Sequence, residues 1–106
     1  MTRVLLVEPD PATRDRLALA LRQARFEVRS SGDAEGGLRL VDEAYPEVAI
    51  FSTERSGMEL AEFCSTARTI AASGRLAVIA LLSAESQSAV DVRDALLAIA
   101  KDLKQR

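Results

Sequence analysis

Apolar residues form four short runs along the chain, at residues 3–8, 26–30, 47–52 and 76–82. The runs at 3–8, 47–52 and 76–82 show little alternation, which is typical of strands buried on both faces of a sheet. The run at 26–30 (FEVRS) alternates between apolar and polar residues, so it predicts a short strand with one exposed face. The pattern therefore predicts four strands.

Between and after these runs, apolar residues recur every three or four positions, which predicts amphipathic helices. The expected helices cover residues 11–24, 34–44, 57–72 and 90–105. Asp10 and Asp33 are suited to cap the first two helices, and Pro11 suits a first helical position. Gly36 and Gly37 should each destabilise the second helix by about 1 kcal/mol relative to alanine, so we expect it to be frayed at its start.

The order of strand then helix, repeated four times, predicts an α/β fold. Strands that alternate with helices form a parallel sheet, doubly wound, with right-handed crossovers and helices on both faces. A chain of 106 residues is long enough for one hydrophobic core. We therefore expect a single domain over residues 1–106.

Composition excludes several classes of function. Hydrophobic residues make up 48% and charged residues 28% of the chain, as in soluble globular domains. The net charge of −2 gives no sign of a nucleic-acid surface, and no apolar run reaches the roughly 18 residues of a membrane span. Histidine is absent and Cys64 is the single cysteine, which disfavours zinc sites and Cys–His catalysis. We expect a cytoplasmic protein without a cofactor.

Candidate functional residues follow from the fold class, because open parallel sheets carry their sites where strands end. Glu8 ends the first strand and is followed by Pro9 and Asp10, Ser52 ends the third strand, and Ser83 follows the fourth. A serine at the end of the third strand would need a base to become a nucleophile, and the chain has no histidine to supply one.

Three stretches resemble the receiver domain of bacterial two-component response regulators. They are RVLLVEPDPATRDRLALAL at 3–21, PEVAIFSTERSGM at 46–58 and AVIALLSA at 77–84. The resemblance extends from residue 3 to about residue 84. It implies a flavodoxin-like fold, which in that family has five strands and five helices. It also implies the activity of that family, in which an aspartate receives a phosphoryl group from a histidine kinase with the help of Mg²⁺.

The positions that would carry this activity are altered. The acidic pair of the family falls on Glu8 and Pro9, and proline cannot ligate a metal. The phospho-acceptor aspartate falls on Ser52. Glu54 matches the position whose backbone carbonyl helps to hold the metal, and Ser83 matches the conserved hydroxyl of the family. The lysine–proline pair that ends the family's fifth strand has no counterpart. We therefore expect a degenerate pseudo-receiver with no catalytic residue and no metal site.

The sequence after Ala84 is shorter than the resemblance requires. Residues 85–106 have room for a loop and one helix, so we expect the sheet to be truncated to four strands, either by an internal deletion or by an early end. The run at 76–82 would then be an apolar edge, which is a site for pairing with another chain. We expect a homodimer that uses this edge and the last helix, unless that helix covers the edge within one chain. The expected surface comprises Leu76, Val78, Ala80, Leu82, Leu96, Ile99 and Leu103.

Three functions remain open at this stage. The favoured one is a non-enzymatic, phosphorylation-independent module that binds a protein partner in a bacterial signalling or regulatory system. The alternative is an active phosphotransfer receiver whose acceptor has moved to Asp10 or Glu8. A domain that binds flavin or a nucleotide ranks last, because EPDPA replaces a glycine-rich loop after the first strand.

Overall fold

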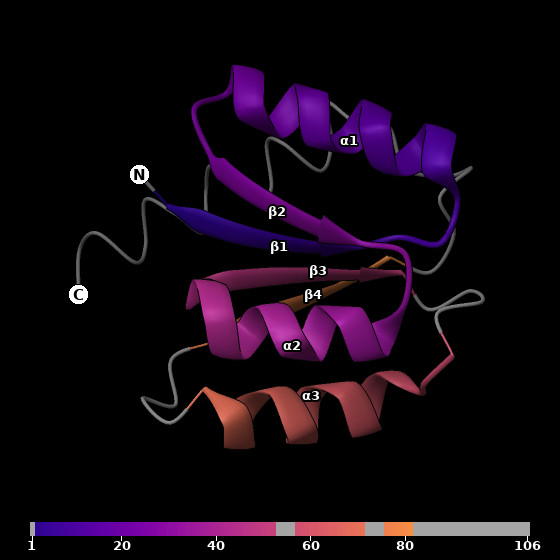
Figure 1. Cartoon of the computed structure of the whole chain (residues 1–106), viewed down its shortest axis with the longest axis vertical. Coiled ribbons are helices and arrows are strands. Elements are labelled where there is room, and N and C mark those ends of the chain that lie inside the picture. The colour runs from indigo at the N-terminus through magenta and orange to yellow at the C-terminus, as the bar shows by residue number, and fades with distance from the viewer. Residues whose placement is uncertain (1, 53–56, 72–75, 82–106) are drawn as a thin grey trace.

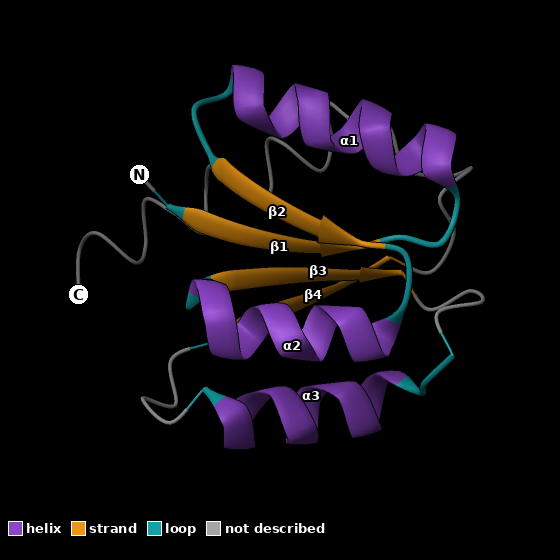
Figure 2. Cartoon of the chain, viewed as in Figure 1, coloured by secondary structure: helices purple, strands orange, loops and turns teal. Residues whose placement is uncertain are grey.

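The computed structural model describes residues 2–52, 57–71 and 76–81. Within this part, four parallel strands form one sheet in the order β2-β1-β3-β4. Three helices connect them in a strictly alternating order (Figures 1 and 2). The elements are β1 (Arg3–Val7), α1 (Pro11–Gln23), β2 (Glu27–Ser31), α2 (Ala34–Ala44), β3 (Val48–Ser52), α3 (Leu60–Ile70) and β4 (Ala77–Leu81).

The helices lie on both sides of the sheet, α1 on one side and α2 with α3 on the other (Figure 1). This arrangement follows from the alternation of side chains along β1 and β3, whose residues are buried on both faces. Even-numbered residues of these strands pack toward α1, and odd-numbered residues of β1 pack toward α2 and α3. The first core contains Val4, Leu6, Leu17, Ala18, Leu21, Phe26, Val28, Val48 and Ile50. The second contains Leu5, Val7, Ala34, Val41, Ala49, Phe51, Phe63, Ala67 and Leu76.

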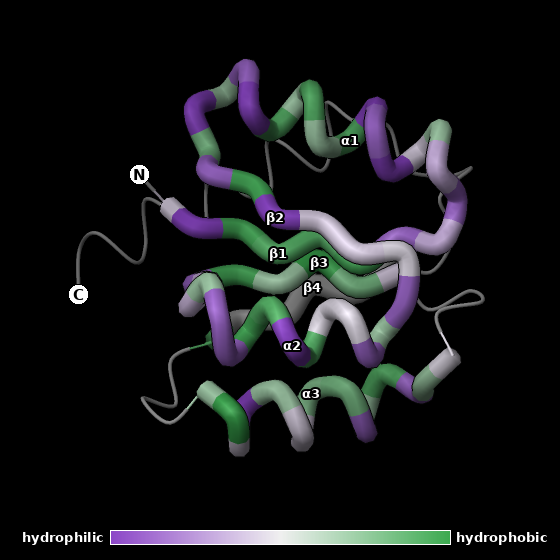
Figure 3. The backbone as a smooth tube through the Cα atoms, in the orientation of Figure 1, coloured by the Kyte–Doolittle hydropathy of each residue, from purple (hydrophilic) through white to green (hydrophobic). Residues whose placement is uncertain are grey.

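The hydropathy of the strands reflects their place in the sheet. The central strands β1 and β3 are hydrophobic, whereas the edge strand β2 is largely polar (Figure 3). On β2, the guanidinium of Arg22 donates a hydrogen bond to the backbone carbonyl of Val28 (3.2 Å). Charged side chains and an occupied carbonyl reduce the tendency of an edge strand to pair with another chain.

Both predicted N-caps are confirmed. The side chain of Asp10 accepts a hydrogen bond from the Thr13 amide (2.9 Å), and Asp33 accepts one from the Gly36 amide (2.7 Å). Pro11 is the first residue of α1, as its fixed φ and missing N–H predict. These caps fix where the two helices leave the carboxyl edge of the sheet.

The expectation of a frayed start to α2 is not met, since the helix begins at Ala34 and contains both glycines. Gly37 is buried against β1. A Cβ atom on it would lie 2.5 Å from Cγ2 of Val7, closer than real carbon atoms approach. The glycine is therefore what lets α2 pack closely on the sheet.

The remaining boundaries agree with the predictions to within a few residues. β1 ends at Val7 and not at Glu8, β2 is shifted by one residue, and α3 runs over Leu60–Ile70 and not over 57–72. The expected helix at 90–105 lies outside the described residues. The residues that would hold a fifth strand also lie outside them.

Gly37→Ala should destabilise the domain by about 1–3 kcal/mol, because the new methyl group overpacks against Val7 and this outweighs the gain in helix propensity. Urea unfolding measures the change. Glu35→Ala, at an exposed position of the same helix, is the matched control and should change stability little. The combination of Gly37→Ala with Val7→Ala tests the contact itself. If the two substitutions are additive, the clash with Val7 is not the cause.

Arg25→Gly should stabilise the domain by about 0.5–1 kcal/mol. Arg25 follows the end of α1 with a φ of 70°, a left-handed conformation that disfavours side chains other than glycine. Gln23→Gly, two residues earlier and inside the helix, should instead destabilise by up to about 1 kcal/mol. Thermal and urea unfolding compare the two. Equal effects of both substitutions would show that backbone conformation at residue 25 is not strained.

Candidate functional site

The carboxyl ends of β1 and β3 bring two polar residues to adjacent positions. In the register of these strands Val7 is paired with Phe51, so Glu8 and Ser52 follow side by side at the edge of the sheet. Both are buried, with exposed fractions of 3% for Glu8 and 1% for Ser52. The Phe51 ring before Ser52 stacks on Phe63 of α3, with 4.3 Å between ring centroids. The packing of α3 therefore fixes the backbone from which Ser52 projects.

The carboxylate of Glu8 is only half satisfied. Its Oε1 accepts a hydrogen bond from the Asp10 amide (3.2 Å), while Oε2 is buried without a partner among the residues that the structure describes. A buried polar atom without a partner destabilises a fold by about 1–3 kcal/mol. Packing alone would favour an apolar side chain at residue 8. A buried polar atom without a partner therefore makes Glu8 a candidate functional residue.

Asp10 does not point into this site. Its carboxylate accepts two hydrogen bonds from Thr13, one from the amide (2.9 Å) and one from the hydroxyl (2.6 Å). These bonds lower the pKa of Asp10 from its ordinary value of 3.8, the hydroxyl having the largest effect, and Arg16 and Arg14 add smaller contributions. Asp10 is thus an ionised helix cap.

Arg14 is a site residue that the sequence pattern did not reveal, because it resembles a solvated residue on the surface of α1. Its Nη1 donates a hydrogen bond to the Glu8 carbonyl (3.0 Å) and would lie 2.9 Å from a Cβ atom placed on Gly32. The guanidinium therefore joins the loop after β1 to the loop after β2. Its position four residues after the N-cap is a signal that could have suggested this contact.

The remaining predicted residues contribute less to the described site. Pro9, which is partly exposed, separates Glu8 from Asp10 and brings neither a carboxylate nor an N–H. Glu54 and Ser83 lie outside the described residues. In the described part of the chain, no three histidine, cysteine, aspartate or glutamate side chains gather closely enough to hold a metal ion. The described site thus offers one buried carboxylate and one neutral hydroxyl.

The structure describes three of the seven residues that were predicted to form a surface for dimerisation along the fourth strand and the last helix. The side chain of Leu76 is 4% exposed and belongs to the core beneath α2 and α3, so it contributes to packing within the chain. Val78 and Ala80 lie on β4, whose backbone pairs with β3. Leu82, Leu96, Ile99 and Leu103 lie outside the described residues.

Comparison with known proteins supports the fold through structure and not through sequence. No family model matches the chain, and no curated protein sequence matches it. Solved structures match over nearly the whole chain. The N-terminal domain of an uncharacterized protein from Wolinella succinogenes has a TM-score of 0.77 at 21% identity, covering 99% of this chain and 98% of that one. The chemotaxis protein CheY4 of Vibrio cholerae has a TM-score of 0.76 at 18% identity, covering 92% and 98%. A CheY-like response regulator receiver domain from Methanospirillum hungatei has a TM-score of 0.71 at 20% identity, covering 99% and 95%.

This chain has the receiver-domain fold. The strand order β2-β1-β3-β4 and the parallel pairing are those of a flavodoxin-like sheet, as the resemblance implied. In an open parallel sheet of this topology, ligands bind at the carboxyl ends of the strands, and here the ends of β1 and β3 carry Glu8 and Ser52. None of the helices in the described part of the chain combines the length and apolar character needed to cross a membrane.

The Asp10 carboxyl should titrate below 3.8, and Thr13→Val should raise its pKa toward that value by removing the hydroxyl donor. Because the pKa is lower in the folded state, the cap stabilises the domain fully above pH 3.8, and this stabilisation is lost as the pH falls through the lowered pKa. Carboxyl NMR titration measures the pKa. Thr69→Val is the control, since the Thr69 hydroxyl lies on α3 and donates to the Ser65 carbonyl. An unchanged Asp10 pKa in Thr13→Val would contradict this assignment.

Proposed function

We propose that this domain is a pseudo-receiver, a module that binds a protein partner in a bacterial two-component signalling system without being phosphorylated. The observation that carries the proposal is Ser52, a buried neutral residue at the end of β3. In the resemblance to receivers, the position of the phospho-acceptor aspartate falls on Ser52. A serine hydroxyl cannot form the acyl phosphate that such an aspartate forms.

The surroundings of Ser52 support the same proposal. Mg²⁺ binds oxygen ligands in octahedral geometry and usually needs one or two carboxylates. Glu8 is the carboxylate that remains next to Ser52, and Pro9 stands where the resemblance implies a second one. The chain has no histidine to act as a base toward the Ser52 hydroxyl. The described site therefore lacks the usual means both to bind Mg²⁺ and to activate a nucleophile.

The alternative of a relocated acceptor is disfavoured by geometry. The Asp10 carboxylate is engaged by Thr13 at the start of α1, and its position is set by the helix that it caps. The Glu8 carboxylate is buried, with Oε1 held by the Asp10 amide, so a phosphoryl donor could reach it only after the loop moved. The exposed Asp10 carboxylate is therefore held by Thr13 at the helix start, and the Glu8 carboxylate is shielded by burial.

The partner of such a module would be a protein, and a second copy of the chain is our proposal for one partner. The polar edge strand β2, on which Arg22 covers the Val28 carbonyl, is poorly suited to pairing. The opposite side of the sheet, with β4 and the residues that follow it, is the surface we propose for dimerisation. We further propose that the module is not an enzyme, has no cofactor and acts in the cytoplasm.

Addition of Mg²⁺ and beryllofluoride should leave the amide resonances of Glu8, Phe51 and Ser52 unchanged in ¹H–¹⁵N spectra. Acetyl phosphate with Mg²⁺ should give no increase in mass. The matched variant carries Pro9→Asp with Ser52→Asp, which restores both missing carboxylates, and it should respond to beryllofluoride. Shifted resonances in the unaltered protein would overturn the proposal. A phosphorylated Asp10 or Glu8 found by mass spectrometry would establish the alternative.

A further inference from the structure

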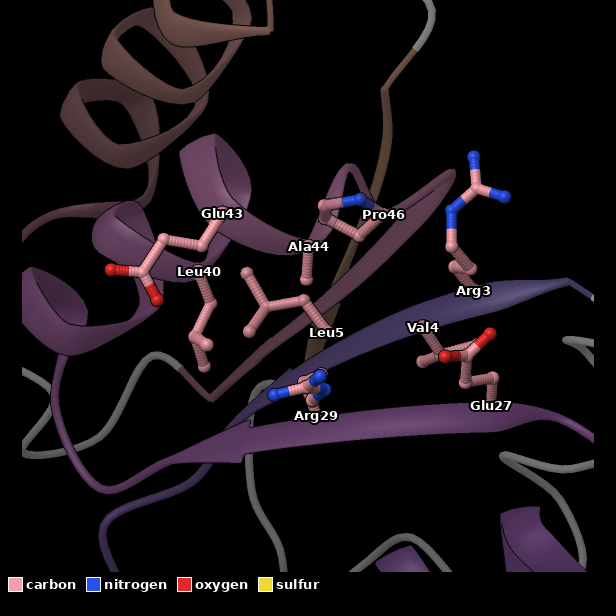
Figure 4. Close-up of a pocket in the computed structure, with 9 residues that line it drawn as sticks. All are labelled: Arg3, Val4, Leu5, Glu27, Arg29, Leu40, Glu43, Ala44 and Pro46. Atoms are coloured by element: carbon pink, nitrogen blue, oxygen red, sulfur yellow. The ribbon is translucent and has the colours of Figure 1, made fainter.

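A cavity lies at the opposite end of the sheet from Ser52. It has a volume of about 190 Å³ and is bounded by the C-terminal half of α2, the first residues of β1 and β2, and Pro46 before β3 (Figure 4). The cavity is on the same face of the sheet as Gly37, which brings the other half of α2 close to Val7. α2 is thus in close contact with the sheet near Gly37 and leaves space beneath Leu40 and Ala44.

The lining combines an apolar floor with charged walls. Leu5, which is 1% exposed, lies with Leu40 and Ala44 around the apolar part of the cavity. Arg29 and Glu27 stand on the same face of β2, because they are two residues apart, and Glu43 comes from α2. In the view of Figure 4, the guanidinium of Arg29 lies between the carboxylates of Glu27 and Glu43.

The charged side chains of Arg29, Glu27 and Glu43 form no ion pair with one another. Among the described residues the one ion pair joins Arg3 to Glu47, with 3.9 Å between Nη1 and Oε1. Arg3 also donates from Nε to the Tyr45 carbonyl (2.8 Å), and in Figure 4 its side chain points away from the other lining residues. Arg29 has neither an ion pair nor a side-chain hydrogen bond within the part of the chain that the structure describes. The Arg29 side chain is exposed, so its guanidinium is open to solvent and available to a ligand.

We propose that this cavity binds a small zwitterion with an aliphatic body, namely a free aliphatic α-amino acid. Arg29 would bind the carboxylate, since a guanidinium offers paired N–H donors that match a carboxylate. The carboxylates of Glu43 and Glu27 would accept hydrogen bonds from the ammonium group. Leu5, Leu40 and Ala44 would contact the aliphatic side chain.

The balance of charge is the reason for choosing a zwitterion. A simple anion would bind Arg29 but would face the two glutamates, and a simple cation would bind the glutamates but would face Arg29 and Arg3. A molecule that carries both charges meets a complementary group for each. The volume is below the roughly 300–1,000 Å³ of pockets for drug-sized ligands, which restricts the ligand to a small molecule. This inference does not depend on the function proposed for the carboxyl edge of the sheet.

The test is a titration of the ¹⁵N-labelled domain with L-leucine at millimolar concentration. We expect leucine to shift the amide resonances of Leu5, Arg29 and Ala44. Two analogues each lack one charge: 4-methylpentanoate has no ammonium group, and 3-methylbutylamine has no carboxylate. Each should bind at least about tenfold more weakly, since each forgoes charged hydrogen bonds. The absence of shifts with leucine, or equal binding of either analogue, would overturn the proposal.

Substitutions of Arg29 and Glu43 test the role of each residue in binding. Arg29→Gln and Glu43→Gln should each weaken leucine binding by about tenfold or more. Arg16→Gln, an exposed position on α1 across the sheet, is the matched control and should leave binding unchanged. Unchanged binding by Arg29→Gln would overturn the proposal. If a variant fails to fold, as judged by thermal unfolding, the comparison of the three ligands on the unaltered protein still decides the question.

Discussion

Burial of β1 and β3 on both faces is the constraint on which the rest of this structure depends. Every residue of Val48–Ser52 is buried, as are residues 4–8, so these strands accept polar side chains only where they end. The polar groups of these two strands are consequently gathered at their ends, where Glu8 and Ser52 lie side by side. The charged residues Glu27 and Arg29 lie instead on the edge strand β2, which has an exposed face.

Most of the fold could be predicted because its signals are local. Continuous apolar runs identified the central strands, alternation identified β2, and Asp10 and Asp33 identified two helix starts. What the sequence could not show was the effect of contacts between elements. Gly36 and Gly37 indicated a weak helix when considered alone, whereas the structure shows that Gly37 allows α2 to approach Val7. Intrinsic propensity carries no information about how near a neighbouring strand lies.

The sequence predicted which residues at the strand ends form the candidate site, but it did not predict the hydrogen bonds between them. The adjacency of Glu8 and Ser52 followed from a parallel sheet, and the capping role of Asp10 followed from its place before Pro11. The half-satisfied carboxylate of Glu8 depends on side-chain geometry, so no pattern of residue types revealed it. The bond from Arg14 to the Glu8 carbonyl left one signal in the sequence, the spacing of Arg14 from the N-cap. The cavity beside Arg29 was missed for the same reason, since its lining comes from segments far apart in the sequence.

The bond from Arg22 to the Val28 carbonyl has a consequence for assembly. A sheet that pairs readily at both edges can add copies at both and grow into a fibre, whereas a sheet with one poorly pairing edge grows at the other. If two such sheets joined on the side of β4, their poorly pairing β2 strands would face outward at both ends of the joined sheet. A symmetric contact uses the same surface on each partner, so assembly would then stop at two copies. Arg22, together with the exposed polar side chains of β2, would in this way limit the size of the complex.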